Sequence, residues 1–209
     1  MTDPTNVYVA IQRMAECDAP AAARVHAAAF PDYFLTRLGP RFLAALYRRL
    51  ARDAGSTAWV AQADGDVVGF AAGVMDRRRF THGFVRRCWP ALAACVAGRA
   101  LTHPAVAWEM ASRVPRLFRG GRAAGEPIEA ATLLSIGVLP AHRGRGVGRQ
   151  VMAACVEGLR EMGARRVLLE TDAQNAAANA FYVRCGFRLH RETRLEGGRA
   201  MAEYLLDLA

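Results

Sequence analysis

Apolar and polar residues follow two periods along this chain, and the periods predict which segments are helices and which are strands. Segments whose apolar residues recur every three or four positions are predicted to be amphipathic helices. Segments with two-residue alternation, or with a short continuous apolar run, are predicted to be strands. The predicted helices are 16 or 18 to 29, 40–52, 146–162 and 175–185, and the predicted strands are 7–14, 57–63, 67–75, 129–138, 166–171, 187–194 and 200–208.

Turn residues separate these segments where the period changes. Asp64-Gly65 lies between two strand-like runs and is a strong signal for a two-residue hairpin turn. Gly163 and Gly186 follow predicted helices and are natural C-terminal caps. The order of elements is mixed, with strand and helix alternating in the second half, so the predicted fold class is α/β (α+β).

Residues 77–127 have no strand pattern, and their apolar residues recur at helical spacing in two groups. We expect two helices there, with Pro90 and Pro115 as kinks or boundaries. A length of 209 residues fits one domain. Residues 1–209 are therefore interpreted as a single domain with a helical insertion at about 77–127.

Charge and cysteine content narrow the class of protein. The formal net charge is +9, and every basic side chain is arginine. This indicates either a basic surface for nucleic acid or an anionic membrane, or the compositional habit of a GC-rich coding sequence; the second is favoured, and no nucleic-acid partner is expected. No apolar run reaches the roughly 18 residues of a transmembrane segment. Five widely spaced cysteines without metal-site spacing predict free thiols, no metal and a cytoplasmic location.

The most informative segment is a Gly-rich turn between the strand predicted over 129–138 and the helix predicted over 146–162. It consists of Arg143, Gly144, Arg145, Gly146, Val147 and Gly148, followed by Arg149. Glycines let phosphate oxygens approach backbone N–H groups, and the helix directs its positive end to the same spot. The residues predict an anion, a di- or triphosphate. A P-loop would need lysine, and the spacing of G-x-G-x-x-G fails after Gly148.

The Gly-rich turn resembles the Q/R-x-x-G-x-G/A signature of the GNAT (Gcn5-related N-acetyltransferase) superfamily, which it matches as Arg143-x-x-Gly146-x-Gly148. A second block is similar to the superfamily's N-x-x-A-x-x-x-Y-x-x-x-G-F motif, and it runs from Asn175 to Phe187. With their flanking strands the blocks cover roughly residues 129–208. The resemblance implies a mixed, mostly antiparallel central sheet flanked by helices, with the helical insertion between strands 3 and 4.

The resemblance also implies roles for single residues, with acetyl-CoA as the co-substrate. The pantetheine arm would pair like an added strand with the main chain of Ile136, Gly137 and Val138. The pyrophosphate would be held by the amides from Arg143 to Gly148, and by Arg149. The cofactor arm would be hydrogen-bonded by Asn175 and Asn179, and the departing thiolate would be protonated by Tyr182.

The spacing of the second block supports these roles and leaves alternatives open. Asn175, Asn179 and Tyr182 are spaced i, i+4 and i+7, so they share one helix face. Asn175 could equally be a helix N-cap, and Tyr182 a half-buried packing residue. The general base is the least defined role. Relatives carry a carboxylate on the central strand, where this chain has Thr132 or Ala130, so the nearby Glu129 is chosen. Other candidates are Ser135, Asp32, His26 and Tyr33.

The resemblance therefore implies an N-acetyltransferase that moves an acetyl group from acetyl-CoA to a primary amine of a small molecule or amino sugar by direct attack. A protein or peptide N-acetyltransferase is one alternative, and an acyl-CoA-binding sensor without activity is another. For the insertion, a substrate lid or an oligomer contact, as in a homodimer, is favoured over a basic amphipathic surface against anionic lipid or nucleic acid.

Overall fold

A computed structural model describes residues 9–87, 129–194, 198 and 200–208. The first half contains strands β1 (Ala10–Arg13), β2 (Ser56–Ala63) and β3 (Asp66–Val74), and helices α1 (Ala19–Ala29), α2 (Phe34–Arg37) and α3 (Pro40–Arg52). The second half contains strands β4 (Ala131–Val138), β5 (Arg166–Asp172), β6 (Arg188–Arg194) and β7 (Ala200–Asp207), and helices α6 (Val147–Glu161) and α7 (Ala176–Arg184).

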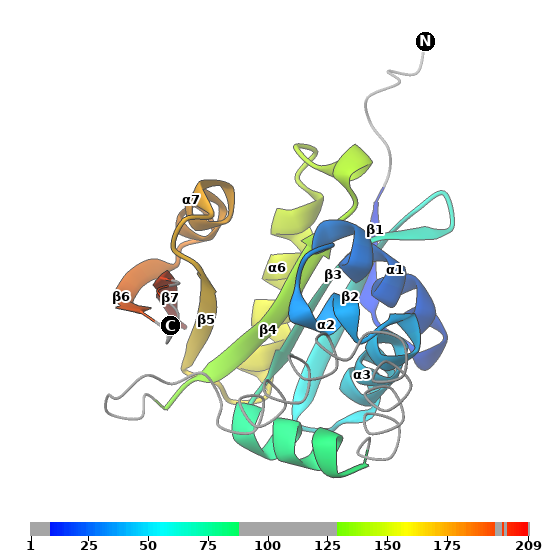
Figure 1. The fold of residues 1–209 in the computed structure, drawn as a ribbon, viewed down its shortest axis with the longest axis horizontal. Coiled ribbons are helices and arrows are strands. Elements are labelled where there is room, and N and C mark those ends of the chain that lie inside the picture. Colours follow the sequence, from blue (N-terminus) through cyan, green and yellow to red (C-terminus); the bar gives the residue numbers. More distant parts are fainter. Residues whose placement is uncertain (1–8, 88–128, 195–197, 199, 209) are drawn as a thin grey trace.

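The seven strands form one sheet in the order β1-β2-β3-β4-β5-β7-β6. All neighbouring pairs are antiparallel except β4 and β5, which are parallel. One face of β1–β4 carries α1 and α3, and the other carries α6 (Figure 1). The predicted fold class, a mostly antiparallel sheet flanked by helices, is confirmed.

Two buried clusters hold these layers together, one on each face of the sheet. The first joins α1 and α3 to the sheet through large residues such as Leu43, Tyr47 and Phe70. The second joins α6 to β3, β4 and β5 through residues such as Val151 and Leu159. Helices α3 and α6 bury the apolar stripe that their sequence period predicts, because that stripe faces the sheet.

The hairpin between β2 and β3 has the two turn residues that the sequence predicts. Ala63 pairs with Asp66, which leaves Asp64 and Gly65 as the two turn residues. Both have positive φ, 52° and 84°, as a type I′ turn requires. The predicted hairpin is confirmed.

The structure corrects the prediction in two places. The strand predicted from Glu129 begins at Ala131, because pairing with β5 starts at Ala131 and the last partner on β3 pairs with Thr132. No element was predicted between residues 29 and 40, where the structure has the short helix α2, whose single turn has too few residues to show a period. Residues 77–87 are helical, as predicted for the start of the insertion, whereas 88–127 lie outside the described residues. None of the described helices is long and apolar enough to cross a membrane.

Candidate functional site

Strands β4 and β5 separate soon after they meet, and this leaves one edge of β4 open. They pair at Ala131–Val167 and Thr132–Leu168, and no further pair joins them in the described part of the chain. Figure 1 shows the two strands diverging towards α7 and the start of α6. We call the unpaired edge of β4, residues 133–138, and the space in front of it the β4–β5 opening. An open edge carries N–H and C=O groups that can pair with an extended ligand.

The backbone groups that face this opening follow from the hydrogen-bond ladder with β3. The Leu139 N–H donates to the Val68 carbonyl at 2.9 Å, and Gly137 lies opposite Phe70. Backbone groups of an antiparallel strand alternate in direction, so Ile136 and Val138 direct their N–H and C=O groups away from β3. Of the three positions predicted for the pantetheine arm, Ile136 and Val138 thus face the opening, whereas Gly137 between them faces β3.

A β-bulge in β4 sets which side chains line the opening. Ala72 and Gly73 are consecutive on β3, but their partners on β4 are Ser135 and Leu133, so Leu134 is the extra residue. After this bulge, Ser135 is on the face covered by α1 and α3, opposite Ala72. Bulges of this kind redirect side chains and commonly lie beside active sites.

The Gly-rich turn presents unpaired amides at the end of β4. Gly144 and Gly146 have positive φ, 76° and 78°, and a Cβ at either position would meet open space within 3.5 Å. The first hydrogen bond of α6 runs from the Gln150 N–H to the Gly146 carbonyl at 3.1 Å, and no side chain caps the helix. The amides of Val147, Gly148 and Arg149 therefore lack helical partners, and such a helix start is suited to an anion.

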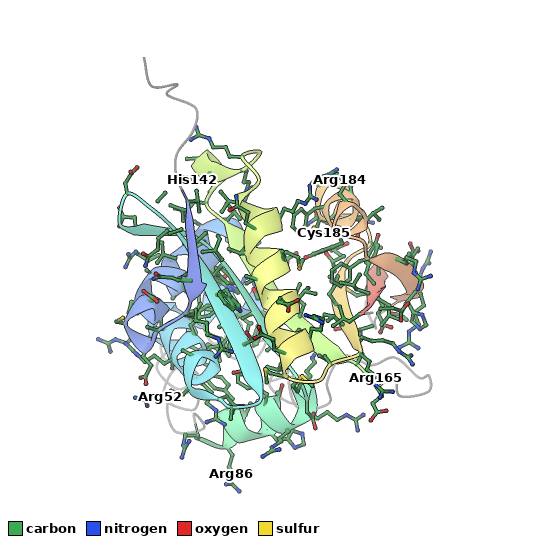
Figure 2. The ribbon with its side chains drawn as sticks, turned by 180° about the vertical axis from the view of Figure 1, so that it is seen from behind. Arg52, Arg86, His142, Arg165, Arg184 and Cys185 are labelled. Carbon is green, nitrogen blue, oxygen red and sulfur yellow. The ribbon has the colours of Figure 1, made fainter. Side chains whose placement is uncertain are left out.

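Arginines surround this helix start. Arg143, Arg145 and Arg149 are exposed there. The Arg143 guanidinium donates through Nε to the Val138 carbonyl at 3.2 Å, which ties the turn to the edge of β4. Figure 2 shows the face covered by α6, with His142 beside the start of this helix and Arg184 on α7. The predicted phosphate-binding residues are thus brought together at one end of the β4–β5 opening.

The two asparagines predicted to bind the cofactor arm, Asn175 and Asn179, have different hydrogen-bond partners in the structure. The Asn175 side chain accepts a hydrogen bond from the Ala178 N–H at 3.1 Å, so it caps α7, as one of the two interpretations of this residue predicted. Asn179 donates through Nδ2 to the carbonyl of Ala173 at 2.9 Å, at the end of β5. Its Oδ1 is buried and has no partner among the described residues. An unpaired buried acceptor costs free energy, which an N–H donor of a ligand arm would recover.

Tyr182 extends from α7 and packs its ring against Phe187 and Tyr204. Burial, together with the neighbouring Tyr33 and Cys185, raises the pKa of Tyr182 to about 12. The phenol is therefore protonated at neutral pH and is a hydrogen-bond donor. Tyr33 belongs to the loop before α2, so residues from the N-terminal and C-terminal halves meet at this point.

A buried hydrogen-bonded chain lies behind Ser135 and was not identified as a unit from the sequence. His26 Nδ1 and the Tyr47 hydroxyl are 2.6 Å apart, and Tyr47 is also hydrogen-bonded to Ser135. Burial lowers the pKa of His26 to about 4 and raises the pKa of Tyr47. Both groups are neutral at physiological pH, so the chain orients the Ser135 hydroxyl without introducing a charge.

The structure does not bring Glu129 into this group. Glu129 is exposed and precedes β4, two residues before the first β4–β5 pair at Ala131. Ten residues separate it from Leu139, or roughly 33 Å of extended chain. Leu134 at the bulge is only five residues, or roughly 16 Å, from Leu139. An extended pantetheine arm of about 13 bonds also spans roughly 16 Å. An arm that starts near Leu139 would therefore end close to the bulge and would not reach Glu129.

Comparison with known proteins identifies acetyltransferases as the proteins that this chain is similar to. A model of the acetyltransferase (GNAT) family matches residues 20–187. A mycothiol acetyltransferase of Amycolatopsis mediterranei is 38% identical over 79 residues, which are 38% of this chain and 25% of that protein. N-alpha-acetyltransferase 30 of Schizosaccharomyces pombe is 33% identical over 60 residues, which are 27% of this chain and 40% of that protein. This chain thus covers less than half the length of either relative.

A solved structure shares the fold over nearly the whole chain. It is yncA of Salmonella typhimurium, described as a putative acetyltransferase with its cofactor acetyl-CoA. Its TM-score is 0.58 at 18% identity, with 98% of this chain and 95% of that chain covered. An identity this low shows the fold and leaves the acceptor substrate open.

Proposed function

Because the chain belongs to the GNAT family of acetyltransferases, we propose that it is an acyl-CoA-dependent N-acyltransferase that moves an acetyl group from acetyl-CoA to a primary amine. The acceptor that we favour is a small molecule or an amino sugar. The reaction converts an ammonium group and a thioester into an amide, a free thiol and one released proton.

One observation carries the proposal: the open edge of β4 leads directly into the uncapped start of α6. The first part offers backbone pairing at Ile136 and Val138, and the second offers amides for a diphosphate. A pantetheine arm joined to a pyrophosphate needs these two features in this order. The unpaired Asn179 Oδ1 adds a third point of attachment at the opposite wall.

When bound, acetyl-CoA would supply an activated acetyl carbonyl and a thiol leaving group. Backbone N–H groups of β4 that face the opening, of which that of Ile136 is nearer the bulge, would be available to stabilise negative charge that develops on the carbonyl oxygen. Tyr182 donates a hydrogen bond to the departing sulfur. With a pKa of about 12, it holds its proton more tightly than a thiol of about 8.5 does. Its raised pKa therefore favours hydrogen-bond donation over full proton transfer.

Two alternatives follow from other observations. Similarity to an N-alpha-acetyltransferase supports a peptide amine as the acceptor. The absence of a carboxylate at the usual position on β4 keeps an acyl-CoA sensor under consideration, since Thr132 occupies that position. A cytoplasmic location and a homodimer remain predictions.

The first experiment measures donor binding and turnover separately. Acetyl-CoA at 100 times its Kd should stabilise the protein by about 2.7 kcal/mol and raise its Tm. Turnover is followed as thiol release with glucosamine, ethanolamine and a peptide with a free N-terminal alanine. Glucosamine or ethanolamine as the better acceptor supports the small-molecule proposal, whereas the peptide as the better acceptor supports the alternative. A thermal shift without thiol release from any amine favours the sensor, and the absence of a shift contradicts the whole proposal.

The second experiment tests Tyr182. Tyr182→Phe removes the hydroxyl and keeps the ring, so it should lower kcat by about 10- to 100-fold and leave the acetyl-CoA thermal shift unchanged. Tyr204→Phe is the matched control, because Tyr204 packs against Tyr182 in the same cluster. Equal effects of both variants would assign Tyr182 a packing role.

A further inference from the structure

Two glutamates lie side by side on the face of the sheet that is opposite α6. Glu170 on β5 is the cross-strand partner of Glu203 on β7. Their neighbours Leu169 and Tyr204 belong to the cluster under α6, and side chains alternate between faces along a strand. Glu170 and Glu203 therefore face the side on which α1 and α3 cover the first half of the sheet.

Arginines compensate the two carboxylates unequally. Arg191 binds both oxygens of Glu203, at 2.7 and 3.0 Å, and the Glu203 side chain is only 2% exposed. Glu170 accepts one hydrogen bond in the described part of the chain, from Arg77 at 2.7 Å, and its side chain is 15% exposed. Glu203 is thus a satisfied structural carboxylate, whereas the second oxygen of Glu170 has no donor among the described residues.

The position of Glu170 along β5 places it in the β4–β5 opening. Leu168 is the last residue of β5 that pairs with β4, and Glu170 follows two residues later, or roughly 7 Å further along the strand. Two residues beyond the partner Thr132, β4 reaches the bulge at Leu134, followed by Ser135. Glu170 and Ser135 therefore stand at the same level on the two walls of the opening and face the same side.

We propose that Glu170 binds the protonated amine of the acceptor, with Ser135 on the opposite wall as a second hydrogen-bonding group. The assignment rests on the proposed function. The assignment makes the proposed function more specific in two ways. It places the acceptor at the bulge, on the face away from α6, and it specifies a cationic primary amine. A partly buried carboxylate attracts an ammonium more strongly than an exposed one does, because water screens it less.

The test compares a cationic acceptor with its uncharged counterpart. Each amine of the panel above has a counterpart in which hydroxyl replaces ammonium: glucose, ethylene glycol and the lactoyl peptide. Glu170→Gln should raise the KM of the best amine by about 10- to 100-fold. The Ki of its hydroxyl counterpart and the thermal shift by acetyl-CoA should stay unchanged. Glu157→Gln, which breaks the exposed ion pair between Glu157 and Arg160 on α6, is the matched control and should change neither constant.

Two further variants separate amine binding from a structural ion pair. Glu170→Asp retains the charge and should recover part of the KM. Arg77→Met breaks the same ion pair but leaves the carboxylate, so it should keep or lower the KM for the amine. The proposal is overturned if Arg77→Met mimics Glu170→Gln, or if Glu170→Gln leaves the KM unchanged while the wild type is active. A wild type that acetylates none of the amines overturns the proposed function, and the assignment with it.

Discussion

The buried His26 gives a prediction that can be worked out quantitatively. Its ring is 4% exposed and stacks among Phe30, Tyr47 and Phe70. Burial lowers its pKa from about 6.5 to about 4. The unfolded chain therefore binds a proton at His26 over a pH range in which the folded chain does not. Stability rises with pH wherever the unfolded state binds more protons, so His26 should destabilise the protein as pH falls from about 6.5 to about 4.

The size of the effect follows from the two pKa values. A shift of about 2.5 units is worth roughly 3.4 kcal/mol at 1.36 kcal/mol per unit, reached in full only below pH ~4. Between pH 7.5 and pH 5 the same linkage gives a loss of roughly 2 kcal/mol. Because His26 is almost fully buried, solvent screening does not reduce this value appreciably.

Urea denaturation at pH 7.5 and pH 5 measures the loss directly, provided that unfolding is two-state. Other titrating groups contribute as well, so the informative quantity is the difference between the wild type and His26→Gln. That variant should reduce the pH dependence by about 2 kcal/mol. His190→Gln substitutes an exposed histidine on β6 in the same way and should leave the dependence unchanged. A difference below about 0.5 kcal/mol for His26→Gln would refute a neutral, buried His26.

Two glycine substitutions test the site and its support. Gly146→Ala forces a side chain into a positive φ, which costs about 1–2 kcal/mol, and puts a methyl group where phosphate oxygens would approach; the acetyl-CoA thermal shift should fall. Gly39→Ala, at φ 96° and also in open space, should lose similar stability and keep the shift, and equal shifts in both variants would argue against phosphate binding at Gly146. Gly137→Ala would place its Cβ 2.8 Å from a ring carbon of Phe70 and should cost about 1–3 kcal/mol in urea denaturation; a cost near zero would show that Phe70 yields easily.

The Gly-rich turn was predictable from sequence because its chemistry is local. Positive φ at Gly144 and Gly146, and the start of α6 immediately after them, depend on neighbours in the chain. The same holds for the Asp64-Gly65 hairpin and for the cap at Asn175. The apolar stripes of α3 and α6 were also predictable, since a helix that covers a sheet must bury one face.

The acceptor side of the site was not predictable in this way. Ser135 reaches the Tyr47–His26 chain because a bulge in β4 shifts the strand against β3 and because α1 and α3 pack over it. Glu170 reaches the same level only because β5 pairs with β4 for two residues and then separates. Glu129, chosen by its closeness in sequence to the expected position, lies before the strand.

Local sequence determined the elements of this protein and the donor half of its candidate site, since backbone conformation and helix capping are set by adjacent residues. Tertiary structure alone decided the acceptor half. Strand order, register and the separation of β4 from β5 come from long-range pairing and from packing of helices on the sheet. These interactions bring together residues that are far apart in the sequence, such as Ser135 with Tyr47, which lies 88 positions earlier.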